Sequence, residues 1–433
     1  MTDKLCLKIN DFGPIKNANL DIKKLNIIAG INGSGKSTSS KLLYTFLLAS
    51  SKKGDYLANK SIYDRFEPLF FTFYHITSGD FNNDPFEKVL NLQEDIDLED
   101  NFFNRKLREK LEILLADINR HEFPDKEKMK ADLKNIEKLI EFNENHNYRY
   151  LNVTNLLLKL EFNVSELIEY PDANVHIHGD INDCKFSYKM DFDSVKIGAK
   201  ISEGYSGCLN FDDVIYVESP SIFELGNMHT TKVPYHLKHL YELVSLEKNS
   251  LDVFDEEYNH RIVSFQEKLS NLIDGQVYYN PTKREFMFRQ NDKEYSLKNT
   301  ASGVKQIGII QMLLENRVLR EDSFLFIDEP EINLHPEWQI KLAEILVLMV
   351  KDLNIQMYIN SHSPQFIEAI EVYSGKYGLV DESAFYLSSN EDDNNFTFKE
   401  IPRENLFELY DNLGSPYDVL DEIRAENIVN GIF

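Results

Sequence analysis

Nine residues near the N-terminus have the types and spacing that bind nucleotide phosphates. They run Gly30-Ile31-Asn32-Gly33-Ser34-Gly35-Lys36-Ser37-Thr38 and fit the pattern G-x-x-x-x-G-K-[ST]. Glycines let backbone N–H groups turn inward around phosphates, and the start of a following helix adds partial positive charge. Lys36 is expected to reach the β- and γ-phosphates, which also makes it a candidate catalytic residue, and the Ser37 hydroxyl to ligate Mg²⁺. The candidate nucleotide-binding residues are Gly30, Asn32, Gly33, Ser34, Gly35, Lys36, Ser37 and Thr38.

Two adjacent carboxylates supply the chemistry that a phosphate loop lacks. The apolar run 324–327 reads as a strand and ends in Asp328-Glu329. Hydrolysis of a nucleoside triphosphate needs one carboxylate to hold the Mg²⁺ shell and another to orient and polarise the attacking water. Asp328 is therefore the candidate metal ligand and Glu329 the candidate catalytic residue. An apolar run that ends in Asp-Glu is common by itself. Paired with the phosphate loop, it is strong evidence for a nucleotide-hydrolysing site.

Two further segments offer groups to a γ-phosphate. Ser302 and Gly303 lie just before an apolar helical run at 307–314, and a serine at a helix start presents a hydroxyl and free N–H groups. The alternative for Ser302 is an ordinary helix N-cap. His362 follows a strand expected at 356–359; a lone histidine at a strand end is commonly structural, so its role depends on the surrounding motif.

The elements that must position these residues can be traced along the chain. A strand at 25–28 delivers the phosphate loop into a helix at 42–48, after an opening hairpin. Residues 54–84 are aromatic-rich and read as irregular, and the stripe of Phe70, Phe71, Phe73 and Tyr74 is expected in the core rather than on a nucleic-acid stacking surface. Apolar residues at helical spacing in 107–118 and 129–140 predict a helical hairpin, and short strands are expected at 214–217, 276–279 and 285–289. We expect a division into 1–84, the N-terminal part of a head; 85–170, a helical hairpin insertion; and 171–433, the C-terminal part of the head, with a helical segment at about 233–274.

Composition and charge narrow the class of protein. The 433 residues are 42% hydrophobic, which is enough for a real core. No apolar run approaches the length of a membrane span, and the N-terminus lacks a signal pattern, so we expect a cytoplasmic protein with no membrane contact. Three cysteines far apart argue against a disulfide framework. With 72 acidic against 47 basic residues, the net charge is −25, so DNA contact is not indicated and would require a local basic patch.

A pair of histidines suggests an alternative metal site. His176-Ile177-His178, followed by acidic residues and later by His229, resembles fragments of a metallophosphatase site. The other ligands of such a site are missing, and alternating histidines on a strand commonly cover a sheet face. The sheet-face interpretation is favoured.

The motifs together resemble the OLD-like and RecF-like ABC ATPases. The segment 329–336 reads Glu-Pro-Glu-Ile-Asn-Leu-His-Pro, a strand comes next, and 361–364 reads Ser-His-Ser-Pro, which is characteristic of the OLD-like branch, the AAA-15/AAA-21 groups. The entry segment 12–18 is also similar. The resemblance implies an α/β fold: an ABC-type, RecA-like P-loop ATPase head with inserted helical, short coiled-coil arms, using ATP and Mg²⁺.

The resemblance also implies roles for individual residues. His362 becomes the switch histidine near the γ-phosphate and joins the candidate catalytic residues. Residues 301–306 become a diverged signature motif, in which Ser302, Gly303, Lys305 and Gln306 act on the nucleotide of the opposite subunit in a head-to-tail homodimer or higher oligomer. Gln93 is the candidate for the Q-loop metal ligand.

The length of chain after the last motif bears on function. The stretch after Pro364 is too short for the Toprim nuclease domain of OLD nucleases. The chain resembles stand-alone ATPase subunits of antiphage systems such as Septu (the PtuA subunit) and PARIS (the AriA subunit). That resemblance implies an ATP-hydrolysing sensor or regulatory subunit that controls a separate nuclease effector. Two alternatives stay open: a RecF-like or SMC-like DNA-repair or DNA-maintenance ATPase, and an ATP-binding assembly scaffold with negligible turnover.

Overall fold

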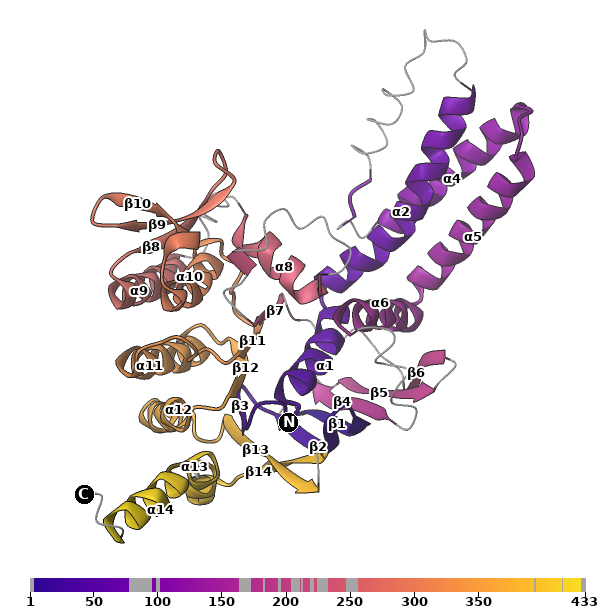
Figure 1. The fold of residues 1–433 in the computed structure, drawn as a ribbon. Coiled ribbons are helices and arrows are strands. Elements are labelled where there is room, and N and C mark those ends of the chain that lie inside the picture. Colours follow the sequence, from indigo (N-terminus) through magenta and orange to yellow (C-terminus); the bar gives the residue numbers. More distant parts are fainter. Residues whose placement is uncertain are drawn as a thin grey trace.

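A single curled sheet organises the head of the molecule (Figure 1). In this computed structural model the described residues are 4–77, 96–98, 102–162, 173–181, 184–193, 196–203, 211, 213–218, 222–223, 233–246, 256–392, 395–414 and 416–429. Within them, 11 strands pair in the order β6-β5-β4-β1-β2-β14-β13-β3-β12-β11-β7. Their bounds are β1 Lys4–Phe12, β2 Ile15–Ile22, β3 Leu25–Gly30, β4 Asn174–Ile181, β5 Cys184–Asp193, β6 Lys196–Glu203, β7 Val214–Val217, β11 Phe324–Asp328, β12 Gln356–Ser361, β13 Ser383–Asp392 and β14 Asn395–Glu400.

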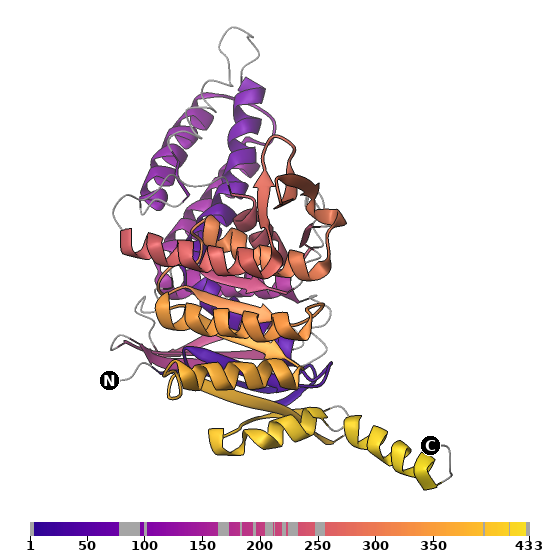
Figure 2. The same cartoon turned by 90° about the vertical axis from the view of Figure 1, so that its left-hand side faces the viewer.

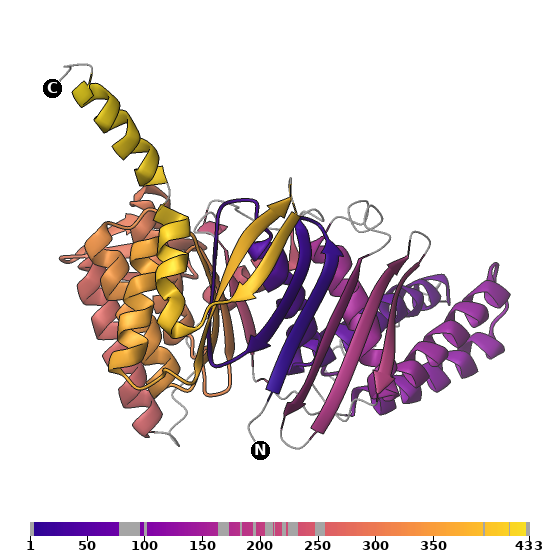
Figure 3. The same ribbon diagram turned by 90° about the horizontal axis from the view of Figure 1, so that it is seen from below.

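The two halves of this sheet are built differently. β13, β3, β12, β11 and β7 run parallel, and every residue of β3, β11 and β7 is buried, as expected for strands covered on both faces. The β6-β5-β4-β1-β2 half is antiparallel, and β2 alternates buried Ala18 and Leu20 with exposed Asn17 and Asn19. Seen from below, these strands curl away from the parallel half (Figure 3).

Helices cover both faces of the parallel half. On one face lies α1, which begins shortly after β3. On the other face lies a stack of helices that continues down to the C-terminus (Figures 1 and 2). The bounds are α1 Lys36–Ala49, α8 Tyr235–Val244, α9 Glu256–Ile273, α10 Ser302–Glu315, α11 Pro336–Asp352, α12 Pro364–Lys376, α13 Leu406–Gly414 and α14 Pro416–Val429, with short 3-10 turns at Leu297–Asn299 and Arg403–Asn405.

A small second sheet accompanies α9 and α10. Its strands β8 Gln276–Asn280, β9 Glu285–Gln290 and β10 Lys293–Ser296 are antiparallel, in the order β10-β9-β8. Gln311 on α10 ties this sheet to the head, because its side-chain oxygen accepts a hydrogen bond from the Val277 backbone N–H at 3.1 Å. The strands predicted at 276–279 and 285–289 are thus confirmed, and so is helix at 235–244 and 256–273, the parts of the predicted segment 233–274 where the structure describes helices.

An arm of three helices projects from the head and has its own apolar core (Figure 1). The helices are α2 Lys52–Thr77, α4 Phe103–Arg120 and α5 Lys126–Glu144, and α6 His146–Glu161 lies across the base of the arm. The predicted hairpin corresponds to α4 and α5. The irregular structure expected at 54–84 is wrong for α2: Ile62, Phe66, Phe70 and Phe73 recur at helical spacing and face the arm core, and Pro68 is accommodated inside the helix.

Because α2 is part of the arm, the arm begins earlier in the sequence than residue 85, where the expected insertion 85–170 begins. The division of the chain into three segments stays a prediction. None of the helices in the described part of the chain is both long enough and apolar enough to cross a membrane.

Candidate nucleotide-binding site

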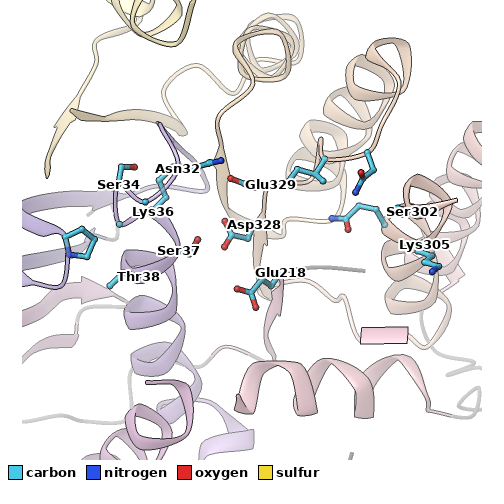
Figure 4. Close-up of a pocket in the computed structure, with 16 residues that line it drawn as sticks. Asn32, Ser34, Lys36, Ser37, Thr38, Glu218, Ser302, Lys305, Asp328 and Glu329 are labelled. Carbon is cyan, nitrogen blue, oxygen red and sulfur yellow. The ribbon is translucent and has the colours of Figure 1, made fainter. Parts of the chain in front are cut away.

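The carboxyl ends of the parallel strands β3, β11 and β7 meet at one cavity of about 880 Å³. Ligands of open α/β sheets bind at this edge because the loops that leave the strands converge there. The phosphate loop after β3 lines one side, Asp328 and Glu329 after β11 line the middle, and the start of α10 lines the far side (Figure 4). Sequence positions almost 300 residues apart thus form one site, as Lys36 and Asp328 were predicted to do.

The phosphate loop has the backbone shape that its glycines predicted. Gly33 and Gly35 have φ values of 79° and 88°, in the region that side chains disfavour. A Cβ atom on Gly35 would also lie 2.5 Å from the Ile15 side chain. Gly35 is the residue immediately before α1, so the free N–H groups at the start of that helix face the cavity. This loop is a preformed anion cradle.

Lys36 turns its ammonium group back into the loop. Its Nζ donates hydrogen bonds of 2.9 Å to the carbonyl oxygens of Gly30 and Ile31, and the residue is only 4% exposed. Burial lowers the pKa of Lys36, and nearby carboxylates, Glu329 foremost, oppose that shift. Buried Ser34 Oγ has no hydrogen-bond partner among the described residues. A buried polar atom without a partner in a cradle of N–H groups fits an incoming phosphate.

Asp328 is held by three elements. Its Oδ1 accepts from Asn360 Nδ2 at 3.1 Å, its Oδ2 accepts from the Tyr216 hydroxyl at 3.3 Å, and the Ser37 side chain also hydrogen-bonds to it. Burial raises the pKa of Asp328, and the hydrogen bonds from Ser37 and Asn360 oppose the rise. Ser37 and Asp328 are thus adjacent, as expected of the two protein ligands of one Mg²⁺ ion.

Glu329 and His362 form a pair across the ends of β11 and β12. His362 Nδ1 lies 3.1 Å from Glu329 Oε1. Glu329 has a φ of 50°, which is rare for a residue other than glycine and typical of constrained functional positions. Both side chains are partly exposed, at 23% for Glu329 and 39% for His362, and Glu329 lines the cavity.

Glu331 organises the loop that carries His362. Its Oε1 accepts hydrogen bonds from Ser361 Oγ at 2.6 Å, from the His362 N–H at 3.1 Å and from the Ser363 N–H at 3.3 Å. The residue is 3% exposed, and burial raises its pKa. The sequence motif contains Glu331 but assigns it no role; in the structure it fixes the position of the loop that carries His362.

The predicted signature residues lie on the far side of the same cavity. Ser302, Lys305 and Gln306 line it, and Gly303 lies beside the loop after β11, where an added Cβ would lie 2.9 Å from the Asn333 carbonyl oxygen. Ala301 occupies the N-cap position of α10, so the Ser302 hydroxyl is not the cap of this helix. Whether these residues act on their own chain's nucleotide or on a partner's stays a prediction, and Figure 4 shows Ser302 separated from Lys36 by Asp328 and Glu329.

Glu218 is a site residue that sequence reasoning missed. It follows β7, the strand next to β11, and its carboxylate lines the cavity below Asp328 (Figure 4). The strand at 214–217 was predicted, and a carboxylate just beyond it was the available signal. The residue predicted as an additional metal ligand, Gln93, lies outside the described residues.

A buried charged network holds Glu218 in place. Its Oε1 accepts from Lys41 Nζ at 2.8 Å, and its Oε2 lies 2.8 Å from His236 Nε2. His236 Nδ1 in turn lies 2.6 Å from Oε2 of Glu161, the last residue of α6. Burial alone would raise the pKa of Glu218, but the hydrogen bond from His236 and the Lys41 charge outweigh it and lower the pKa to about 2. Burial would lower the pKa of His236, but its two carboxylate partners raise it.

The residues present fit a nucleoside triphosphate with Mg²⁺. A cradle of N–H groups suits the phosphates, and one hydroxyl with one or two carboxylates is the protein ligand set that Mg²⁺ takes when phosphate oxygens complete its shell. The alternative site at His176 and His178 gains no support. Their rings lie 4.8 Å apart on β4, and no cluster of three histidine, cysteine or acidic side chains suited to a metal occurs in the described ranges.

Comparisons with known proteins give distant structural neighbours. No curated protein matches the chain. Solved structures that align with it include an SMC head domain from Thermotoga maritima, at 11% identity and TM-score 0.38 over 93% of this chain and 99% of that one. An SMC head with an extended coiled coil from Pyrococcus furiosus, bound to the C-terminal domain of ScpA, aligns at 11% identity and TM-score 0.42 over 98% and 100%.

The family assignment rests on a model that covers most of the chain. The fold is α/β, a P-loop ATPase head with a large mixed, curled sheet and helices on both faces of its parallel half. The family model AAA_15, described as an AAA ATPase domain, matches residues 6–367. The chain therefore belongs to the AAA_15 family of ATPases.

Proposed function

We propose that the chain binds and hydrolyses ATP with Mg²⁺ and uses its nucleotide state to control a separate nuclease in a prokaryotic antiphage defence complex. One observation carries the catalytic part: Lys36, Asp328 and Glu329 line one cavity, and His362, from a neighbouring strand end, lies beside Glu329. These groups are the phosphate anchor, the metal ligand and the water-activating base that phosphoryl transfer to water requires.

Each side chain has a separate task in this proposal. Lys36 and the loop N–H groups hold the phosphates, and Ser37 with Asp328 holds Mg²⁺, which neutralises charge on the phosphate oxygens. Glu329 accepts a proton from the attacking water. His362, beside Glu329 Oε1, orients that carboxylate and is itself kept in place through Glu331. Glu218 lies close enough to Asp328 in the cavity lining to contribute to the hydration of the ion.

The direct test is nucleotide binding and turnover by the purified chain. We expect Mg²⁺-dependent release of phosphate from ATP, and loss of ATP binding in Lys36→Ala because the ammonium group that anchors the phosphates is gone. Glu337→Gln, an exposed residue in the first turn of α11, is the control and should match the wild type. ATP affinity retained by Lys36→Ala, or turnover unaffected by chelation of Mg²⁺, would contradict the proposal.

The defence role is supported by the motif resemblance and by the short arm. α4 and α5 have 18 and 19 residues, or about 27–29 Å at 1.5 Å per residue, whereas long coiled coils that hold DNA apart run over many heptads. A short arm suits contact with a protein partner near the head. The acidic net charge of −25 points the same way, because it disfavours broad contact with DNA.

Affinity isolation from the native host tests the partner. The tagged Glu329→Gln chain, which should keep ATP bound, is isolated with ATP present and its companions are identified by mass spectrometry. A nuclease whose activity changes with the nucleotide bound by the chain supports the defence role. Recovery of DNA with repair factors would instead favour the second candidate, a RecF-like or SMC-like maintenance ATPase, for which the ABC-type head with a projecting arm is the supporting observation. Negligible turnover by the wild-type chain, with ATP binding intact, would favour the scaffold alternative.

A further inference from the structure

A second cavity lies at the base of the arm, away from the nucleotide site. It has a volume of about 320 Å³, lies between α2, α5 and α6 and is open to solvent, with Arg65 and Lys159 among the exposed residues of its lining. Its polar lining comes mainly from Ser61 and Arg65 on α2 and from Arg149, Asn155 and Lys159 on α6. Leu57, Ile62 and Val153 form its apolar floor. A volume near 300 Å³ is at the lower end of the range that binds small molecules.

The charge of this arm-base cavity is opposite to that of the protein. Among the described residues, three cationic side chains line it and no carboxylate does, although the chain as a whole carries a net charge of −25. The neighbouring cavity, which shares Arg149, is mixed in charge: Lys52 and Lys53 line it together with the carboxylates of Asp55, Glu144, Asp213 and Glu242. A local concentration of positive charge within an acidic protein therefore distinguishes the arm-base cavity.

Two of the three cations do not neutralise a neighbouring acid within the described ranges. Arg65 and Lys159 make no ion pair with any residue of the described ranges, whereas Arg149 is paired with Asp55 at 3.0 Å. The buried Oδ1 atom of Asn155 has no hydrogen-bond partner among the residues that the structure describes. Because the amide oxygen and nitrogen are assigned from their surroundings, this amide can equally present its NH₂ group to an acceptor. Within that part of the chain, two unpaired cations and an unsatisfied amide lie around one cavity.

We propose that the arm-base cavity binds a small phosphorylated anion of about nucleotide size. Guanidinium groups match phosphate oxygens with paired hydrogen bonds, lysine adds a mobile charge, and an amide and a serine hydroxyl complete a donor set. The small volume and the acidity of the rest of the surface favour a compact ligand over a polynucleotide.

The position of the cavity would let a bound ligand act on the ATPase site through helix α6. α6 presents Arg149, Asn155 and Lys159 to the cavity. The same helix contacts α1 through the Tyr150 hydroxyl, 3.4 Å from the Phe46 carbonyl oxygen, and its last residue, Glu161, holds His236 and through it Glu218. One helix therefore lies between the arm-base cavity and the nucleotide cavity.

Binding of inorganic pyrophosphate, measured by isothermal titration calorimetry, tests the proposal. The Lys36→Ala chain is used so that the nucleotide cavity does not take up the probe. We expect one binding event, weakened about tenfold by Arg65→Ala and about tenfold by Lys159→Ala, since each removes a charge-assisted hydrogen bond. Lys134→Ala, an exposed cation on α5 outside the cavity lining, is the matched control and should change the affinity by less than about twofold.

Three outcomes would overturn the proposal. One is the absence of a binding event in the Lys36→Ala chain. Another is binding that Lys134→Ala weakens as much as Arg65→Ala and Lys159→Ala do, which would indicate general attraction of anions. The third is binding of a single-stranded oligothymidylate through Arg65 and Lys159 without binding of pyrophosphate, which would make the surface a nucleic-acid contact. None of these outcomes depends on ATP turnover, so the arm-base cavity can fail while the proposed function stands.

Discussion

His362 Nδ1 lies 3.1 Å from Glu329 Oε1, although 33 residues separate the two side chains in the sequence. The contact exists because β11 and β12 are neighbouring parallel strands, with Asp328 paired to Asn360, so the residues that follow each strand meet at one edge. Glu331 completes the arrangement by accepting three hydrogen bonds from residues 361–363. Glu331 thus holds the backbone N–H of His362, and Glu329 contacts its ring.

Removal of the imidazole should therefore reduce turnover more than binding. We expect His362→Ala to lower kcat for ATP hydrolysis by about 100-fold, the lower part of the range for loss of a positioned acid–base group, with ATP affinity within a few-fold of wild type. Steady-state phosphate release and equilibrium nucleotide binding measure the two effects. His260→Ala, an exposed residue on α9, should change neither. Equal losses in binding and turnover would place His362 in nucleotide binding rather than in catalysis.

A mixing experiment decides whether Ser302 acts on its own chain or on a partner. Lys36→Ala and Ser302→Glu should each be inactive, the first through lost phosphate binding and the second through repulsion of the γ-phosphate. If the signature acts in trans, random pairing gives heterodimers in about half of the population, each with one intact site, and restores about a quarter of wild-type activity. A mixture that stays inactive would show that the cavity of one chain is the complete site.

The network of Glu161, His236 and Glu218 should be necessary for stability. His236 has no exposed side-chain surface and separates two carboxylates, so His236→Leu leaves both without their shared partner. We expect a loss of about 3–5 kcal/mol in the free energy of unfolding, as for other broken buried ion pairs. Chemical denaturation measures it, with the exposed His260→Leu as control. The carboxylate partners raise the pKa of His236 in the folded chain above its value of about 6.5 in the unfolded chain. The stabilisation by charged His236 is therefore fully present below pH 6.5 and is lost as the pH rises through the pKa of the folded chain.

His239 should have the opposite pH dependence. Burial, aided by the Lys53 charge, lowers the pKa of His239 to about 3. Asp213 lies 3.8 Å away and would favour a charged ring, but that distance is long and complete burial dominates. The unfolded chain therefore binds a proton below about pH 6.5 that the folded chain rejects, and stability falls as the pH decreases. The free energy of unfolding should fall between pH 7 and pH 5, and we expect His239→Asn to remove about 2 kcal/mol of that fall. Denaturation midpoints at both pH values test this, and an unchanged acid dependence would show that His239 is charged in the folded state.

The local motifs were predictable because each is a short run with its own physical pattern. The phosphate loop, the apolar strand before Asp328 and the helices α4 and α5 could be read from adjacent residues. The location of Glu218 could not be read from adjacent residues, because it depends on the pairing of β7 with β11. Only the order of the strands in the sheet reveals that pairing. The same applies to Tyr216 and Asn360, which hold Asp328 from two different strands.

Helix α2 shows why the aromatic segment was misread. The cluster of aromatic side chains was interpreted as irregular structure. The segment is instead a helix, in which the Pro68 ring is tolerated because packing against α4 and α5 outweighs the lost hydrogen bond. Phe66, Phe70 and Phe73 face that arm core and Phe71 stays exposed, which is the periodicity of a helix. The role of Glu331 was missed for a different reason: its partners, residues 361–363, lie one helix and one strand further along the chain.

The most direct test of the account is a comparison of ATP binding and ATP hydrolysis in wild type and Glu329→Gln. The substitution keeps the shape of the side chain but removes the base that accepts the proton from water. The account predicts that Glu329→Gln binds ATP and Mg²⁺ as tightly as wild type and hydrolyses ATP at least about 100-fold more slowly. Hydrolysis at the wild-type rate in that variant would contradict the assignment of Glu329 and, with it, the mechanism built on the Glu329–His362 pair.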